Sequence, residues 1–197
     1  MDAVRVALLR EVLAGTEWLG ATRRFAGVLR GSVVSHGGGL LLVGTPAYEP
    51  WHLAAHLVDE AAWSGTPELA PTLVRPDARP GDPAHLAVGP GRIEAARRGE
   101  TLLVVAPEEP AELLERVHEA RRAGVTVLAL GAGGGELAAM AHDALAVPEG
   151  AELDLDSVQH LVSAAAGENN SPRVRRGFRD RLSRLADILT APPAAPW

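Results

Sequence analysis

The residues of this chain best suited to chemistry are His52 and His56, which stand four positions apart. On a helix this spacing puts both imidazoles on one face, as a His-x-x-x-His metal site requires. His56 alone is also a candidate general base, because histidine titrates near neutral pH. A third interpretation is structural, with both histidines donating ordinary hydrogen bonds near a subunit interface. No Glu follows His52, so the zincin motif is excluded.

A second group of candidates lies in two loops that follow expected strands. Leu40–Val43 predicts a central parallel strand, and Gly44–Glu49 is the turn after it. Thr101–Ala106 predicts another strand, which the loop Pro107–Pro110 follows. Ligands in open α/β sheets bind beyond the carboxyl ends of the strands. A ligand of this chain is therefore expected to meet these two loops.

The loop after Ala106 is poorly suited to a phosphate. Phosphate sites use backbone N–H groups, hydroxyls and cations. This loop has no hydroxyl and no basic residue, Pro107 has no N–H, and Glu108 and Glu109 would repel a dianion. The two carboxylates either mark a helix that starts at Pro110 or accept sugar hydroxyls or an amine.

The elements that position these loops follow from hydrophobic spacing. An amphipathic run, Ala111–Ala123, lies between the strand at Thr101 and a second apolar run, Val125–Leu130, and makes a βαβ unit. A leading helical region is expected from Asp2 to about Leu29, with a break at Gly15 and an end at the following glycines. The other expected elements are a helix from Pro50 to about Trp63, a strand Leu69–Val74, a loop Arg75–Pro90, a short helix Arg92–Arg98, a strand Ala144–Val147 and a helix Leu155–Ala166 capped by Asp154 or Asp156.

A glycine-rich segment, Gly131–Glu136, follows the strand at Val125 and opens a short helical run. It invites comparison with a dinucleotide-binding fingerprint, but the third fingerprint position is Glu136 instead of Gly or Ala. We therefore interpret the segment as a tight turn that needs positive φ angles.

We expect residues 1–170 to form one domain, 171–190 an Arg-rich amphipathic helix and 191–197 a disordered tail. Residues Phe178, Leu182, Leu185 and Ile188 form an apolar stripe in the Arg-rich segment. This stripe predicts a helix that packs on the domain or on a partner subunit. Nucleic-acid binding through its arginines is the disfavoured alternative.

The composition excludes several classes of protein. The 197 residues suffice for one domain with a sizeable core, and the absence of cysteine excludes disulfides and thiolate-bound metals. A net charge of −6 argues against a protein that coats DNA. No apolar run reaches the ~20 residues of a membrane span, and the N-terminus lacks the pattern of a signal peptide. We expect a cytoplasmic protein that makes no membrane contact.

Three segments together resemble the SIS (sugar isomerase) domain, and within it the sedoheptulose-7-phosphate isomerase (phosphoheptose isomerase) branch. His52–Leu57 is similar to the branch's His-Phe-Ala-Ala-Glu-Leu, Ala120–Leu137 to its second crossover, and Val158-Gln159 to the Ile-Gln of its last core helix. The resemblance covers most of residues 1–167. It implies a three-layer αβα sandwich with a central parallel sheet and leading N-terminal helices. It also implies a homo-oligomer, dimer or tetramer, because the branch buries its leading helices between subunits.

The chain departs from this pattern where the branch binds and converts its substrate. The branch's Gly-Asn-Gly-Gly-Ser loop is reduced here to Gly44 followed by Thr-Pro-Ala-Tyr, and its Ser-Thr-Ser-Gly-Asn-Ser loop is replaced by Ala106–Pro110. The family's catalytic Glu falls on His56, and its catalytic His falls near Gly167. The resemblance therefore implies a pseudoenzyme with degenerate phosphate-binding loops.

The resemblance also places the candidate site. Some members of the branch bind zinc through the His-bearing helix and the Gln helix, so His52, His56 and Gln159 are candidate zinc ligands, with His160 or Asp59 as further candidates; no other cofactor is expected. We predict a non-catalytic SIS-like protein that binds a carbohydrate derivative or acts through protein contacts in regulation or assembly. The alternative is a phosphoheptose-isomerase-like enzyme with a remodelled site. The candidate ligand-binding residues are Gly44, Thr45, Tyr48, Trp51, Glu108 and Gln159.

Overall fold

The computed structural model describes residues 3–148, 150–151 and 153–168. The predicted Arg-rich helix and tail, residues 171–197, lie outside the described residues. The helices are α1 (Ala3–Val12), α2 (Glu17–His36), α3 (Trp51–Ser64), α4 (Gly91–Glu94), α5 (Ala111–Arg122), α6 (Glu136–Met140) and α7 (Leu155–Gly167). The strands are β1 (Leu40–Val43), β2 (Pro71–Val74), β3 (Thr101–Ala106), β4 (Thr126–Gly131) and β5 (Asp143–Ala146), and a 3-10 turn spans Pro67–Leu69.

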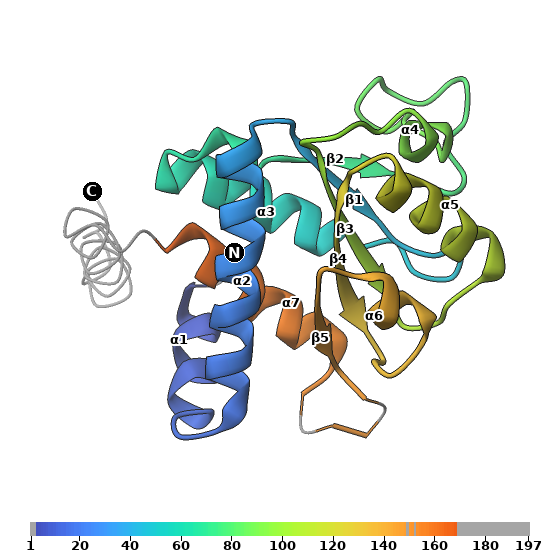
Figure 1. Ribbon diagram of the computed structural model, residues 1–197. Helices are drawn as coiled ribbons and strands as arrows, with labels where there is room; N and C mark the ends of the chain where they lie inside the picture. The colour runs from blue at the N-terminus through green and yellow to red at the C-terminus, as the bar shows by residue number, and fades with distance from the viewer. Residues whose placement is uncertain (1–2, 149, 152, 169–197) are drawn as a thin grey trace, which may run out of the picture.

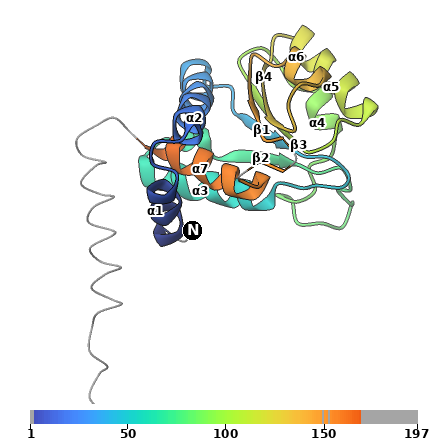
Figure 2. The same cartoon turned by 90° about the horizontal axis from the view of Figure 1, so that it is seen from below.

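The strands form one parallel sheet in the order β2-β1-β3-β4-β5. Helices α4, α5 and α6 cover one face of the sheet, while α2, α3 and α7 cover the other (Figures 1 and 2). This arrangement is the three-layer αβα sandwich that the sequence predicts. The central strands β1 and β3 are buried along their whole length, as expected for strands covered on both faces.

Alternation along the strands divides the apolar side chains into two cores. Leu40 and Leu42 point toward α2, α3 and α7, where they join Phe25, Leu57 and Val158. The intervening strand residues belong to the core under α4, α5 and α6, which contains Leu41, Val43, Leu102, Val104, Ile93, Leu113 and Val117. Because successive side chains enter the two cores in turn, all residues of β1 and residues 102–106 of β3 are apolar. The exception, Thr101, is buried with its hydroxyl donating to Ser32 Oγ at 3.1 Å.

Helix α7 packs against both α2 and α3, and side chains of α1 and α2 bind its carboxyl end. Arg30 of α2 donates to the Ala166 carbonyl at 2.8 Å, and Arg10 of α1 pairs with Glu168 at 2.6 Å. Asp154 caps the start of α7 by accepting from the Ser157 amide at 2.7 Å, which confirms one of the two predicted caps. The carboxyl end of α7 thus lies beside α1 and α2.

The observed elements differ from the prediction mainly at their ends. The break at Gly15 is confirmed, with φ of 90°. Helix α2, however, continues through Gly31 and ends at Gly37, whose amide bonds to the Val33 carbonyl in a left-handed cap. Of the segment Leu69–Val74, only Pro71–Val74 is extended. Among the described residues, no helix is long and apolar enough to cross a membrane.

Candidate functional site

The carboxyl ends of the five parallel strands meet at one edge of the sheet, and the loops that follow them define the candidate site. The loop after β1 begins at Gly44 and leads into α3. Arg75 follows β2, Pro107–Pro110 follows β3, and 132–135 follows β4. Most of the sequence-predicted ligand-binding residues belong to these loops, whereas Gln159 comes from α7.

The loop after β1 is closed by its own backbone. The Thr45 amide donates to the Tyr48 carbonyl at 2.8 Å, and the Tyr48 amide donates to the Thr45 carbonyl at 3.0 Å. Pro46 has no N–H. Gly44 is required at the start of the loop because an added Cβ would lie 2.0 Å from the Tyr48 carbonyl oxygen. Of residues 45–48, only Ala47 has an amide outside this pair of bonds.

The Tyr48 side chain fastens the same loop to α7. Its hydroxyl donates to Asp156 Oδ1 at 2.5 Å and accepts from Gln159 Nε2 at 2.6 Å. Burial, and then the hydrogen bond to Asp156, raises the pKa of Tyr48 to about 12. The phenol is therefore neutral at physiological pH and stays a donor to Asp156. The structure thus brings Tyr48 and Gln159, two of the candidate ligand-binding residues, into contact.

Three buried polar side chains near this loop keep unpaired atoms among the described residues. They are Thr45 Oγ1, Gln159 Oε1 and both ring nitrogens of His56. Thr45 is fully buried, and Gln159 is 2 % exposed. A buried polar atom without a partner costs roughly 1–3 kcal/mol, so these atoms are the groups on this side of the sheet most able to gain from a small polar ligand.

His56 lies between α3 and α7, with its ring centroid 4.5 Å from that of His160. Burial, and to a smaller extent the neighbouring His160 and His52, lower the pKa of His56 to about 4. The imidazole is neutral at pH 7. It is 9 % exposed, so a substrate reaches it only if the helices or the Tyr48 loop move. His56 thus has the charge state of a base but lacks an open approach.

The zinc ligands proposed from the resemblance are divided between surface and interior. His52 is exposed on α3, whereas His56 and Gln159 are buried. In the part of the chain that the structure describes, no group of three His, Cys, Asp or Glu side chains is placed to hold a metal ion. Zinc binding by His52, His56 and Gln159 stays a prediction.

The loop after β3 is filled by a carboxylate of its own. Glu109 accepts from the Leu137 amide at the start of α6, with an Oε2–N distance of 3.3 Å. An added Cβ at Gly135 would lie 2.3 Å from the Glu109 carboxylate. Helix α5 does begin beside Glu108-Glu109, but Pro110 stands just before its first residue and neither carboxylate caps it. Glu108 is exposed.

The glycine-rich loop after β4 has the conformation predicted for it. Gly133 and Gly134 have φ angles of 77° and 73°, and α6 starts two residues later. This tight turn places the Leu137 amide opposite Glu109. The interpretation of Gly131–Glu136 as a turn is confirmed.

Arg75 is a site residue that sequence reasoning placed only in a surface loop. It follows β2 directly, and its guanidinium bonds to Glu49 at 3.2 Å and to Asp82 at 2.9 Å. It also lies 4.8 Å from the ring centroid of Trp51, in a cation–π contact. Its position at the end of a strand was the available signal. Two carboxylates already neutralise it, so it is poorly suited to an anionic ligand.

The position of the resembled catalytic histidine is filled by another side chain. Gly167 is buried at the end of α7, and an added Cβ would lie 1.9 Å from Glu60 Oε2 of α3. A side chain added at Gly167 would require the Glu60 carboxylate to move. Of the two positions where the resemblance places acid/base residues, one has the buried imidazole of His56, and Gly167, near the other, has no side chain.

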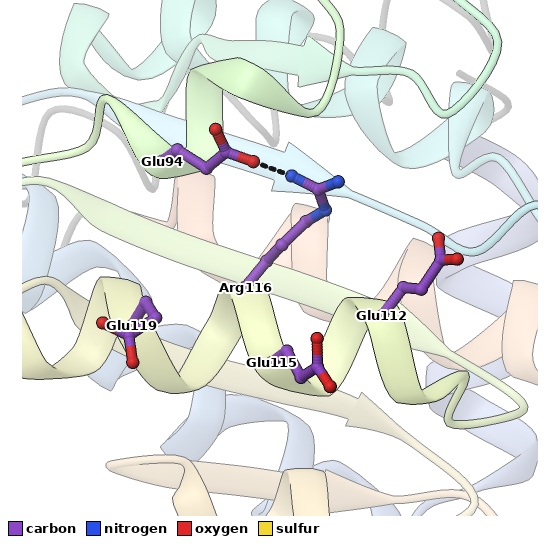
Figure 3. A pocket seen from close by; sticks show the side chains of 5 residues that line it. All are labelled: Glu94, Glu112, Glu115, Arg116 and Glu119. Carbon is purple, nitrogen blue, oxygen red and sulfur yellow. Dashed lines mark hydrogen bonds and ion pairs between the residues drawn. The ribbon is translucent and has the colours of Figure 1, made fainter.

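A surface hollow on the opposite face of the sheet offers no better anion site. It lies between α4 and α5 and is lined by Glu94, Glu112, Glu115, Arg116 and Glu119 (Figure 3). Figure 3 shows its one cation, Arg116, bonded to Glu94. The lining is therefore acidic and repels phosphate.

The fold belongs to the SIS type, and this is what comparison with solved structures shows. No protein-family model matches the sequence, and no curated protein matches it. A structure from Salmonella typhimurium LT2, of a protein proposed to bind sugar, has a TM-score of 0.53 at 15 % identity; the match covers 96 % of this chain but 56 % of that one. The sequence-based expectation of an SIS-type three-layer fold is confirmed.

Two further neighbours have lower scores. The sugar isomerase domain of an RpiR transcription factor from Sphaerobacter thermophilus has a TM-score of 0.49 at 15 % identity, covering 82 % of this chain and 86 % of that one. A phosphoheptose isomerase from Francisella tularensis has a TM-score of 0.45 at 15 % identity, covering 93 % of both chains.

Proposed function

We propose that this chain is a non-catalytic SIS-type protein that acts through protein contacts in a regulatory or assembly role. The observation that carries the proposal is the closed loop after β1. The amides of Thr45 and Tyr48 bond to each other's carbonyls, and the Tyr48 phenol is held by Asp156 and Gln159. Two of the backbone donors that this loop could offer to a sugar phosphate, the amides of Thr45 and Tyr48, are therefore already used inside the chain.

The neighbouring loops support the same proposal. Glu109 takes the Leu137 amide, and Arg75 is neutralised by Glu49 and Asp82. Gly167 has no side chain, so α7 supplies no proton carrier at this position. Each of these features removes one requirement of aldose–ketose isomerisation, namely anion binding or a positioned proton carrier.

Protein contacts are favoured by the apolar side chains that the helices expose. Leu8 and Val12 of α1 and Trp51, Val58 and Trp63 of α3 are 39–77 % exposed. Large apolar side chains exposed on these helices are available for contacts with other proteins. We propose a homo-oligomer, dimer or tetramer, in the cytoplasm.

A second candidate function is the binding of a carbohydrate derivative that lacks phosphate. The unpaired buried atoms of Thr45 and Gln159 favour it, because sugar hydroxyls both donate and accept hydrogen bonds. The Salmonella neighbour, whose proposed role is sugar binding, is consistent with it. Such a ligand would have to displace Tyr48 from Gln159.

Calorimetric titration with sedoheptulose 7-phosphate and with the free sugar, together with an isomerase assay, tests these proposals. We expect no turnover and no binding of the phosphate ester above that of the free sugar. Tyr48→Phe is the informative variant, because it removes the phenol oxygen that Gln159 contacts; stronger binding of the free sugar to it would support the second candidate.

Turnover that His56→Ala abolishes would instead show an isomerase and overturn the main proposal. Metal analysis of the purified protein provides a separate check. Stoichiometric zinc that is lost in both His52→Ala and His56→Ala would favour a remodelled metalloenzyme.

A further inference from the structure

Helix α3 has an uncharged face that points away from the core. The buried residues of the helix lie on the opposite face and are Leu53, His56, Leu57 and Ala61. Four exposed residues at spacings of four, three and four form the outward face, which we call the α3 stripe: Trp51, Ala55, Val58 and Ala62. Trp51 is 39 % exposed and Val58 is 49 % exposed.

Helix α5, on the other side of the sheet, shows how a solvated helix of this chain is composed (Figures 1 and 2). Exposed residues at corresponding spacings along it are all charged, namely Glu112, Glu115, Glu119 and Arg122. Charged residues are expected on the outward side of a surface helix. The α3 stripe departs from that pattern over its whole length, so it is suited to packing against a protein surface.

The order of large and small residues makes the α3 stripe complementary to itself. When two α3 helices pack antiparallel about a two-fold axis, the two stripes meet in reverse order. Trp51 then lies opposite Ala62 of the partner subunit, and Val58 lies opposite Ala55 of the partner subunit. Each layer pairs a larger side chain with an alanine, which lets the helices approach closely. A parallel pair would place each large side chain against its own copy.

The charged residues beside the α3 stripe favour the same orientation. His52 and Asp59 are seven residues apart and flank the stripe on one side. In the antiparallel pair His52 comes next to Asp59 of the partner subunit, twice by symmetry, so that an imidazole meets a carboxylate. A parallel pair would bring the two Asp59 carboxylates together, which is unfavourable. Charge complementarity thus favours a second copy of this chain as the occupant.

Trp51 is held in place at one end of the α3 stripe. The Arg75 guanidinium lies 4.8 Å from its ring centroid and is itself paired with Glu49 and Asp82. A side chain that is already ordered loses little conformational freedom on binding. Tryptophan is also enriched among the residues that carry most of the binding energy of interfaces. Trp51 is therefore suited to anchor the contact.

We propose that two copies of this chain associate through their α3 stripes, antiparallel about a two-fold axis. Ala55 and Val58 form the centre of the interface, and Trp51 forms its two ends. The inference rests on the proposed function, because it assigns an interface to the homo-oligomer proposed there.

Sedimentation equilibrium of the full chain tests the interface with two matched substitutions. Val58→Asp puts a carboxylate at the centre of the contact in both copies and should weaken dimerisation about 100-fold. Val34→Asp is the matched control, because Val34 of α2 is 50 % exposed, and it should leave dimerisation unchanged. Both side chains are exposed in the single chain, so both variants should keep the circular dichroism spectrum of the wild type.

Disulfide formation tests the orientation, because the chain has no native cysteine. A chain with Ala55→Cys, mixed with a tagged chain that carries Val58→Cys, should form the mixed disulfide. Ala62→Cys alone should form no disulfide dimer, because its two copies lie about 16 Å apart along the antiparallel helices. Rapid disulfide formation by Ala62→Cys alone would contradict the antiparallel orientation.

The outcomes separate this inference from the function on which it rests. A wild-type chain that is monomeric at high micromolar concentration would overturn both the α3 interface and the proposed homo-oligomer, in favour of a different protein on the α3 stripe. An oligomer that Val58→Asp leaves intact, or that Val34→Asp dissociates instead, would overturn the α3 interface alone.

Discussion

The loops after β1 and β3 both lack a phosphate site, but for different physical reasons. The loop after β1 closes through two backbone hydrogen bonds and is then fastened to α7 by Tyr48. The loop after β3 keeps an open backbone and places one carboxylate, Glu109, on the amide of Leu137. The first loop is therefore built into the packing of the helical layer, whereas the second depends on a single surface-accessible side chain.

The comparison predicts that substitutions in the first loop affect the whole fold and those in the second act locally. An atom added at Gly44 would clash with the main chain, which cannot move aside as the end of a side chain can. If the Glu109 carboxylate is removed, a water molecule can accept the hydrogen bond of the Leu137 amide instead. Four substitutions or titrations test this difference, from the largest expected effect to the smallest.

Gly44→Ala should destabilise the protein by about 3 kcal/mol, because its Cβ would meet the Tyr48 carbonyl at 2.0 Å and Pro50 Cδ at 2.6 Å. Urea unfolding measures the change. Gly27→Ala is the matched control: its Cβ has open space in the exposed face of α2, so it should stabilise the protein by roughly 0.5–1 kcal/mol. Equal effects of both substitutions would show that the first loop is not rigid.

His56, on the helix that follows the first loop, should make the stability of the protein sensitive to acid. The pKa of His56 is about 4 in the folded chain, against an ordinary value of 6.5, so the unfolded chain binds the proton more tightly. The free energy of unfolding therefore has its full value above pH 6.5 and decreases as the pH falls from 6.5 toward 4. We expect a loss of about 2 kcal/mol over this range.

Urea unfolding as a function of pH measures this loss, and His56→Leu should reduce its slope. Asp59 of α3 opposes the shift, while His52 and His160 reinforce it. The helix after the second loop provides the matched control, because His118 of α5 is exposed. His118→Leu should keep the acid-dependent loss. If His56→Leu keeps it too, another group is responsible.

These two predictions also show what the sequence could and could not reveal. Leu40–Val43, Thr101–Ala106 and Val125–Leu130 were predictable as buried parallel strands because each is a short apolar run bounded by turn residues. The lack of phosphate-binding groups was predictable from residue type alone. Pro46 and Pro107 have no N–H to donate, and Glu108 and Glu109 repel a phosphate. Gly44 was identified through the resemblance. The structure explains why glycine is needed there, because an added Cβ would clash with the Tyr48 carbonyl.

The side-chain partners across the fold were not predictable in the same way. The contact of Tyr48 with Asp156 joins residues 108 positions apart, and Glu109 reaches Leu137 across 28 positions. No local pattern encodes such pairs, since they depend on how the loops and helices pack. Arg75 was missed for a similar reason: its partner Glu49 is 26 positions away in the loop after β1, although its other partner, Asp82, lies in its own loop.

Tyr48 is the only tyrosine of the chain, so tyrosine ionisation followed by absorbance at alkaline pH reports on this side chain alone. We expect a midpoint near pH 12 in the folded protein, as the raised pKa requires, against the ordinary value of 10. Because the folded pKa is the higher one, the associated stability is present below pH 10 and is lost as the pH rises toward 12. Asp156→Asn should move the midpoint downward by removing the charge that opposes ionisation.

Tyr48→Phe sharpens this test through stability at neutral pH. We expect a loss of about 1 kcal/mol, because one hydrogen bond to a carboxylate disappears at a half-buried position while Gln159 Nε2 keeps the Leu155 carbonyl. A midpoint near pH 10 in the wild-type protein, or no cost for Tyr48→Phe, would mean that the loop is not fastened to α7.

Glu109→Ala should have the smallest effect, roughly 0.5 kcal/mol, because its bond to Leu137 is long and partly open to water. The expected change is local: the Leu137 amide should exchange faster and shift in the NMR spectrum, while the amides of Thr45 and Tyr48 stay as they were. Glu108→Ala, at the exposed neighbour, is the control and should change neither amide. A loss as large as that of Gly44→Ala would erase the difference between the two loops, because it would show that the Glu109 carboxylate, too, is part of the packed structure.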